Sequence, residues 1–251
     1  MNPLLSLKNI TFSYGNSRKP VFEETSFELG EIERVGLIGP NGCGKTTFLQ
    51  LCIGLLKPSK GTIFFRGKRV ESDSDLLELR KAIGFVFQNP DDQLFSPTVL
   101  EDVAFGPLNL GIDRERAKEI ALESLELVGL RGFENRITHR LSGGEKRLLS
   151  LATVLAMRPT AMLLDEPSTG LDSQMREQII KVLNHLNQAL VIVSHDWDFV
   201  VQTTSQFYSI ENRKIVKVEK GLLHQHLHYH PSGQLPHEHF DLPTKKGSHL
   251  F

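Results

Sequence analysis

The stretch Gly39-Pro40-Asn41-Gly42-Cys43-Gly44-Lys45-Thr46 decides the fold. It matches the pattern G-x-x-x-x-G-K-[ST], whose glycines let backbone N–H groups turn inward around phosphate oxygens. An apolar segment at 34–38 precedes it, and apolar residues at helical spacing predict a helix over 45–56. A strand, a glycine-rich loop and a helix in this order predict a site for a polyphosphate nucleotide. The alternative, a chance glycine-rich turn, leaves the lysine and the hydroxyl unexplained.

The loop supplies several groups that a nucleotide requires. Lys45 can reach the β and γ phosphates, and the hydroxyl of Thr46 can hold Mg²⁺. The residues predicted to contact the nucleotide in this stretch are Gly39, Pro40, Asn41, Gly42, Cys43, Gly44, Lys45, Thr46 and Thr47.

A second acidic element lies at 161–166, where an apolar run ends in two adjacent carboxylates. Asp165 is expected to bind the hydration shell of Mg²⁺, and Glu166 is expected to polarise the attacking water, because phosphoryl transfer depends on positioning and charge stabilisation. An apolar strand followed by Asp-Glu is also ordinary strand-end chemistry. The phosphate loop upstream favours the catalytic interpretation.

Strand and helix patterns alternate along the chain. Residues 5–14 and 21–27 predict an antiparallel edge region, and residues 114–128 show the helical period. Short apolar runs typical of buried parallel strands lie at 83–87, 161–164 and 190–193. This alternation predicts the α/β fold class. Near residue 221 the composition shifts to histidine, proline and glycine, so we expect a folded domain over 1–220 and a flexible tail over 221–251.

Composition excludes several classes of function. With 39% hydrophobic residues, the 251-residue chain can form one compact unit. A formal net charge of −1 offers no basic field, so we expect no nucleic-acid partner. Two cysteines make no disulfide framework, which fits a reducing cytoplasm. No apolar run approaches the ~18 residues of a membrane helix, and residues 1–10 lack the features of a signal peptide, so a membrane role requires a partner.

The segment Leu141-Ser142-Gly143-Gly144-Glu145 resembles the signature motif of the ABC ATPases. A helix is expected to begin directly after it, at Lys146. Tyr14 stands where that family stacks an aromatic on adenine, Gln88 resembles the Q-loop glutamine, residues 168–172 resemble the D-loop, and His195 resembles the switch histidine. Taken singly, an aromatic on a strand or a histidine after one is often structural. The order of the motifs favours the family, over roughly residues 4–220.

The resemblance implies a P-loop NTPase fold with a RecA-like core, an N-terminal antiparallel β region and an α-helical subdomain inserted at about 89–154. It implies ATP hydrolysis with Mg²⁺. The catalytic residues would be Lys45, Gln88, Glu166 and His195, and the Mg²⁺ ligands would be Thr46, Gln88 and Asp165. The remaining nucleotide contacts would be Tyr14, Ser142, Gly143, Gly144, Glu145 and Asp172.

In that family two subunits pair head to tail, so that the signature of one completes the nucleotide site of the other. The resemblance therefore implies a homodimer, or a heterodimer with a second ABC ATPase. Two positions depart from the family's usual residues: Glu145 stands where glutamine is common, and Cys43 stands where a smaller residue is common. Neither departure removes a catalytic group.

Residues 88–95 and 98–107 resemble the ATPases of energy-coupling-factor importers, including the cobalt and nickel uptake branch. This implies a membrane coupling subunit, a substrate-capture subunit and a peripheral position at the cytoplasmic face of the cell membrane. The apolar residues expected to line the groove for the coupling helices are Leu94, Phe95, Val99 and Phe105. Internal packing of the helical subdomain is the alternative for each of them.

The predicted tail is dense in histidine. Six lie within sixteen positions: His224, His226, His228, His230, His237 and His239. Imidazoles suit nickel, cobalt, zinc or copper better than magnesium or calcium, so the tail predicts transition-metal binding. An expression tag and a polar extension without a role are the alternatives.

The sequence thus favours a transport ATPase that energises import of a transition metal such as cobalt or nickel, with vitamin uptake as the alternative cargo. A soluble ABC protein acting on nucleic acid would show a second cassette, a coiled-coil insertion or a basic patch, and none is visible. A P-loop kinase acting on a small molecule would have no use for the signature segment or for His195.

Overall fold

The computed structural model describes residues 2–15, 17, 19–218, 224–228 and 237–241, the last two ranges by their backbone alone. Its centre is a six-stranded sheet in the order β10-β9-β3-β8-β7-β6. The strands are β3 (Arg34–Ile38), β6 (Ile83–Val86), β7 (Ala161–Asp165), β8 (Ala189–Val193), β9 (Gln206–Glu211) and β10 (Lys214–Val218). All neighbours pair in parallel except β9 with β10. Every residue of β7 and β8 is buried, which explains their continuous apolar sequence.

A second, antiparallel sheet has the order β2-β1-β4-β5. It consists of β1 (Leu5–Phe12), β2 (Phe22–Leu29), β4 (Lys60–Phe65) and β5 (Lys68–Arg69), which confirms the expected N-terminal edge region. In β2 buried and exposed residues alternate over most of the strand, as expected when one face packs on a core. That core fills the space between this sheet, α1 (Lys45–Cys52) and the central strands.

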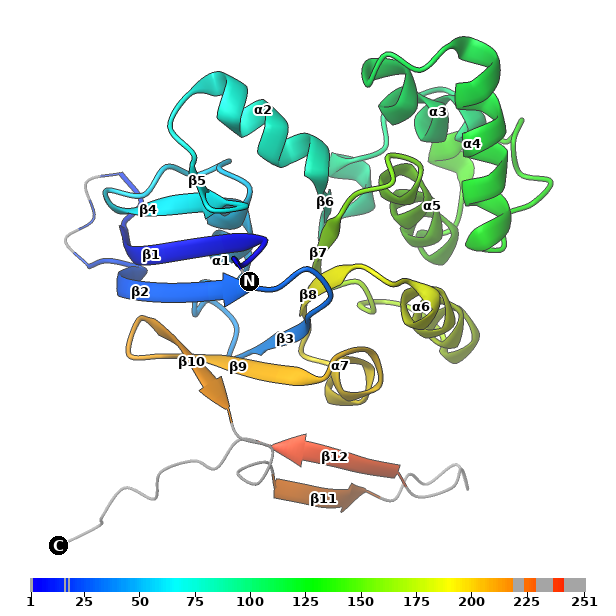
Figure 1. The fold of residues 1–251 in the computed structure, drawn as a ribbon. Coiled ribbons are helices and arrows are strands. Elements are labelled where there is room, and N and C mark those ends of the chain that lie inside the picture. The colour runs from blue at the N-terminus through cyan, green and yellow to red at the C-terminus, as the bar shows by residue number, and fades with distance from the viewer. Residues whose placement is uncertain (1, 16, 18, 219–223, 229–236, 242–251) are drawn as a thin grey trace, which may run out of the picture.

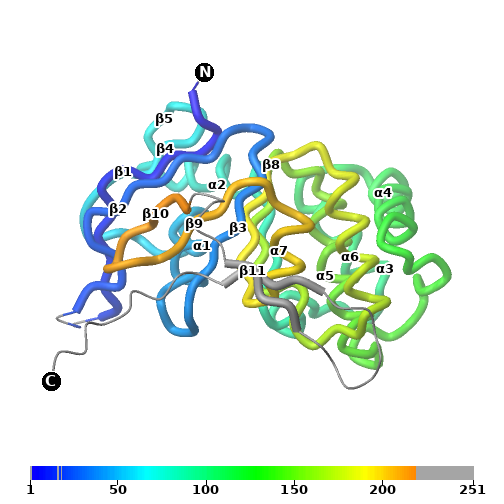
Figure 2. Tube along the Cα trace, turned by 90° about the horizontal axis from the view of Figure 1, so that it is seen from below, coloured from blue at the N-terminus to red at the C-terminus, as the bar shows by residue number. Residues whose placement is uncertain are grey.

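Three helices form a separate layer: α3 (Val99–Asn109), α4 (Arg114–Leu127) and α5 (Gly143–Leu155). They gather on the side of the central sheet away from the antiparallel sheet (Figures 1 and 2). Their apolar faces share a core cluster with β7, β8 and α6. The predicted helical subdomain is present, with α2 (Asp73–Ala82), α6 (Ser173–His185), α7 (Trp197–Thr203) and short 3-10 turns at Pro90–Asp92 and Thr138–Arg140 completing the helices.

Within the described ranges, no helix combines the length and the apolar character that a membrane span requires.

Three sequence-based expectations about local structure were wrong. The helix after the phosphate loop ends at Cys52, not at residue 56, because Gly54 adopts φ 63° and breaks the helical path. The helix after the signature begins at Gly143, not at Lys146, because Ser142 caps it. Leu94 and Val99 are buried in the helical core cluster and are not among the residues that line the groove at Phe95 and Phe105.

The C-terminal region carries two short strands, β11 (His224–His228) and β12 (His237–Asp241), which pair antiparallel where the sequence predicted a tail. His230 and the imidazoles of His224, His226, His228, His237 and His239 lie outside what the structure describes. Among the residues that it does describe, no three His, Cys, Asp or Glu side chains form a metal-binding group.

Candidate active site

The phosphate loop connects β3 to α1 and is shaped by its glycines. Gly42 and Gly44 adopt φ 78° and 111°, a region that a side chain disfavours. The Lys45 ammonium donates to the carbonyls of Gly39 at 2.8 Å and Pro40 at 3.1 Å, and this side chain is buried. The lysine is therefore held across the loop, where its charge can meet a phosphate group.

A cavity of about 300 Å³ opens beside this loop. Its lining joins the loop to residues that follow the neighbouring strands β6 and β7, namely Asn41, Gly42, Gly44, Lys45, Thr46, Thr47, Gln88, Asp165 and Glu166. The carboxyl ends of parallel strands are where open α/β sheets bind ligands. The structure thus brings the two acidic residues and the phosphate loop together, as the sequence predicted.

Asp165 is suited to a hydrated cation. It is almost fully buried, and its Oδ1 atom has no hydrogen-bond partner in the described chain. Burial raises the pKa of this carboxyl above its usual value, although the Thr46 hydroxyl and the Lys45 charge oppose that shift. A buried, unpaired carboxylate oxygen beside the Thr46 hydroxyl matches the oxygen ligands that Mg²⁺ prefers.

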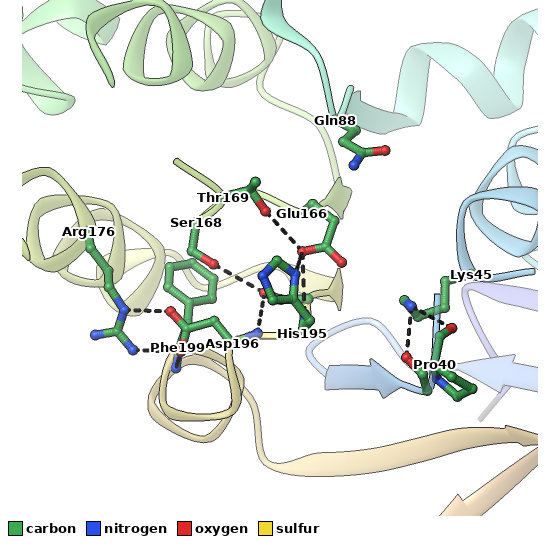
Figure 3. Close-up of polar contacts among 12 residues, drawn as sticks. Pro40, Lys45, Gln88, Glu166, Ser168, Thr169, Arg176, His195, Asp196 and Phe199 are labelled. Atoms are coloured by element: carbon green, nitrogen blue, oxygen red, sulfur yellow. Dashed lines mark hydrogen bonds and ion pairs between the residues drawn. The ribbon is translucent and has the colours of Figure 1, made fainter. Parts of the chain in front are cut away.

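Glu166 is held in position by three donors that all reach its Oε2 atom. The His195 Nδ1 atom lies 2.8 Å from it, the Thr169 hydroxyl donates at 3.2 Å, and the His195 backbone N–H donates at 3.3 Å (Figure 3). The backbone of Glu166 has φ 49°, which is strained for a residue with a side chain. Strain of this kind clusters at functional sites, which supports a catalytic role for Glu166.

The loop that carries His195 is fixed by an ion pair. Asp196 caps α7 by accepting from the Phe199 N–H at 3.0 Å, and both of its oxygens bond the Arg176 guanidinium of α6, at 2.7 and 3.0 Å (Figure 3). The pKa of the Asp196 carboxyl lies below its usual value. Burial alone would raise this pKa, but the hydrogen bonds from the Arg176 guanidinium and the Phe199 N–H lower it by more. Asp196 is thus kept charged, and the imidazole of His195 stays beside Glu166.

The start of α5 binds the segment around Gln88. The buried Arg147 guanidinium donates to the backbone carbonyls of Gln88 and, at 3.2 Å, Thr169. The Lys146 ammonium lies 2.6 Å from the Asp91 carboxylate. Sequence analysis missed both cations, since nothing in the local pattern distinguishes them from exposed helical residues.

The remaining predicted residues are not among those that line this cavity. Tyr14 is about half exposed, packs edge-on against Phe12 and shares a 2.9 Å hydrogen bond with Thr47. Ser142, Gly143, Gly144 and Glu145 form the first turn of α5 and do not line the cavity of their own chain. Nor does Asp172, whose carboxylate caps α6 by accepting from Met175. The geometry therefore assigns Asp172 a capping function.

Comparison with known proteins places this geometry among nucleotide-binding subunits of transporters. Residues 22–169 match the family model described as "ABC transporter". A putative ABC transporter ATP-binding protein of Nitratidesulfovibrio vulgaris is 49% identical over 95% of this chain and 87% of its own. The energy-coupling factor transporter ATP-binding protein EcfA of Methanothermobacter thermautotrophicus is 42% identical over 85% of this chain and 70% of its own.

Solved structures agree with these relatives. The cbiO1 protein of Clostridium perfringens, described as part of the ABC transporter complex cbiONQ, has a TM-score of 0.77 and 31% identity over 86% of this chain and 88% of its own. A dimeric ATP-binding cassette in a post-hydrolysis state with ADP and Pi has a TM-score of 0.77 and 28% identity over 84% of this chain and 96% of its own.

We predict that Cys43 of the phosphate loop reacts slowly with iodoacetamide. Burial raises the pKa of its thiol, so less thiolate is present at a given pH, and the midpoint of the rate-against-pH curve should lie above pH ~8.5, the midpoint of an ordinary thiol. ATP should slow the reaction, because it covers the loop. Labelling is followed by mass spectrometry, with C43S and the fully buried Cys52 as controls. A midpoint at or below pH ~8.5, or a rate that ATP leaves unchanged, would contradict this.

Proposed function

The chain belongs to the ABC transporter ATPases, and from this membership we propose that it is the ATP-hydrolysing subunit of an energy-coupling-factor type importer. The observation that carries the proposal is the cavity in which the phosphate loop meets Gln88, Asp165 and Glu166. Relatives named as energy-coupling factor ATP-binding proteins support the type of transporter.

The chain's own residues supply most of the chemistry. The Lys45 ammonium would exchange its two carbonyl partners for phosphate oxygens of ATP. Thr46, Gln88 and Asp165 would hold Mg²⁺, which would neutralise charge on those oxygens when bound. Glu166 would orient the attacking water and draw its proton, while His195 keeps the carboxylate in place. Tyr14 would stack on adenine at the exposed side of the loop.

We infer that a second ABC ATPase subunit, identical or related, completes the site. Ser142 caps α5, and the N–H groups of Gly143 and Gly144 that follow it lie in the first turn, where helical N–H groups have no partner within the helix, a setting suited to an anion. Because this turn lies outside the cavity of its own chain, the γ-phosphate it receives would belong to ATP held by the partner. The dimeric cassettes among the structural neighbours support this arrangement.

An apolar groove with a volume of about 280 Å³ lies where residues after α1, of β6 and of the helical layer meet. The apolar residues that line it include Ile53, Leu55, Phe95, Phe105 and Met157. Phe95 and Phe105 pack edge-on with ring centres 4.7 Å apart, yet 67% and 45% of their surfaces are exposed. Exposed aromatic residues at an apolar groove mark protein interaction sites. We propose that a coupling helix of a membrane protein binds here, at the cytoplasmic face of the cell membrane, and that a substrate-capture subunit completes the complex.

For the cargo we propose a transition-metal cation such as cobalt or nickel. The support is the density of histidine between residues 224 and 239 and the likeness to a cbiO1 protein. Vitamin uptake by the same motor is the alternative, since the energy-coupling factor relatives carry no named cargo.

E166Q tests the enzymatic part of the proposal. It should keep ATP affinity but lower turnover by about 10²–10⁴-fold, because an amide cannot accept the proton of the attacking water. The protein should also accumulate as an ATP-bound dimer, measured by size-exclusion chromatography alongside steady-state hydrolysis. E177Q, on the exposed face of α6, is the matched control. Turnover that survives in E166Q would rule out Glu166 as the catalytic base.

F95D tests the docking groove. A buried charge at a contact centre should weaken association with the membrane coupling protein by at least about tenfold, while hydrolysis by the isolated subunit stays within about twofold. Retention is measured on the co-expressed, detergent-solubilised complex. L127D, at an exposed leucine of α4 outside the groove, should retain the partner. Equal retention of both variants would place the membrane contact elsewhere.

Metal titration tests the proposed cargo. Isothermal titration of nickel, cobalt and zinc into the full chain should give binding that a chain ending at Gly221 lacks, because truncation removes all six clustered histidines. ATP hydrolysis followed in parallel shows whether binding affects the motor. Absence of binding in both forms would remove the argument from histidine and favour a vitamin as the cargo.

A further inference from the structure

The first turn of α5 carries a carboxylate. The Ser142 N–H donates to Glu145 Oε2 at 2.7 Å, and the Glu145 N–H donates to the Ser142 hydroxyl at 3.3 Å. This reciprocal arrangement is a capping box, which a glutamate or a glutamine can complete equally. The glutamate therefore stabilises the helix start, and it also fixes a negative charge there.

That charge opposes the proposed role of the turn. The backbone N–H groups that follow Ser142 would receive the γ-phosphate of an ATP held by the second subunit. Two anions brought together as the interface closes repel each other strongly, because water that would screen them is expelled. An uncompensated Glu145 would therefore weaken closure of the dimer around ATP.

Arg136 provides the compensating charge. Its guanidinium lies 3.4 Å from Glu145 Oε1, the oxygen that the capping box does not use. The guanidinium also stacks on the Phe133 ring, 3.5 Å from the ring centre, and the Arg136 N–H donates to the Phe133 carbonyl at 2.8 Å. The Arg136 carbonyl in turn accepts from the Val99 N–H of α3 at 3.1 Å. The arginine is thus held by a fixed loop rather than swinging freely.

The next two cations of the helix are engaged elsewhere. Lys146 pairs with Asp91, and Arg147 bonds to the carbonyls of Gln88 and Thr169. Both interactions direct positive charge toward the subunit's own Gln88 segment. The ion pair that the structure gives Glu145 is with Arg136.

We propose that Arg136 is a positioning residue for closure of the ATP-bound dimer: it neutralises Glu145, so that the first turn of α5 can receive the γ-phosphate of ATP bound to a second subunit. This inference rests on the proposed function. It assigns Arg136 no contact with the nucleotide and makes its effect conditional on the charge of Glu145.

A rescue experiment tests whether the effect of Arg136 on dimerisation depends on the charge of Glu145. In the slowly hydrolysing E166Q chain, ATP-dependent dimerisation is measured by analytical ultracentrifugation for four proteins: the parent, R136A, E145Q and R136A/E145Q. R136A should weaken dimerisation by about tenfold, and E145Q should dimerise at least as well as the parent. R136A/E145Q should return to within about twofold of E145Q, because its capping box is intact and no charge remains to be neutralised.

Two further measurements separate charge from structure. R136K keeps the positive charge but loses the planar stacking on Phe133, so it should dimerise nearly as well as the parent. Raising the salt from about 0.05 M to about 0.5 M should narrow the gap between R136A and the parent. Steady-state hydrolysis in chains that retain Glu166 should follow the same order of variants.

The outcomes are distinct. If R136A dimerises as the parent does, or if the double variant stays as weak as R136A, the charge compensation is overturned and Arg136 is a structural residue. If the parent E166Q chain does not dimerise with ATP under any of these conditions, the proposed head-to-tail dimer fails first, and the inference fails with it.

Discussion

Three neighbouring parallel strands, β3, β8 and β7, end at one edge of the central sheet, and the nucleotide site depends on that alignment. β3 leads into the phosphate loop, β7 ends at Asp165 with Glu166 next, and β8 is followed closely by His195. Because parallel strands require long crossover connections, these groups are far apart in the sequence and meet only through the sheet. The buried apolar strands hold them more rigidly than loops alone could, which is what a site for phosphoryl transfer requires.

At the same edge of the sheet a buried polar atom lacks a hydrogen-bond partner and one residue has a strained backbone, and both features indicate a ligand site. Lys45 bonds to loop carbonyls, one buried oxygen of Asp165 lacks a partner within the described chain, and Glu166 occupies a strained backbone conformation. An unpaired buried polar atom and a strained residue each cost on the order of 1–3 kcal/mol. A cation held with the phosphate chain would give the unpaired Asp165 oxygen a partner, so that part of the cost borne by the free chain would be recovered when the nucleotide binds.

The sequence predicted those parts of the site that depend on a short, contiguous stretch of residues. The phosphate loop, the Asp165–Glu166 pair and the approximate helical subdomain each depend on a contiguous pattern, and each is where the pattern indicated. Long-range bonds escaped prediction: Arg147 reaches the carbonyl of Gln88 across the fold, and a single arginine in a helix gives no sign of that. Of the four residues expected to line a groove, Phe95 and Phe105 do and Leu94 and Val99 are buried, because apolar character alone cannot distinguish exposed Phe95 from buried Val99. The helix end at Cys52 depended on the left-handed conformation of Gly54, which periodicity does not encode.

Helix α5 connects the signature turn, the segment that holds Gln88 and the groove at Gln93. Its first turn presents the signature residues, and the Lys146 and Arg147 side chains bond to the segment that holds Gln88. Farther along the helix, the Ser150 carbonyl and the Thr153 hydroxyl accept from the Gln93 amide at 2.8 and 2.7 Å. Gln93 also lines the proposed docking groove. In the proposed importer, α5 would move as a rigid helix with contacts at the groove, at Gln88 and at the signature, so a membrane helix that shifts the Gln93 segment would also shift the signature turn. Coupling between the groove and the nucleotide would then need no flexible relay, since one helix reaches both.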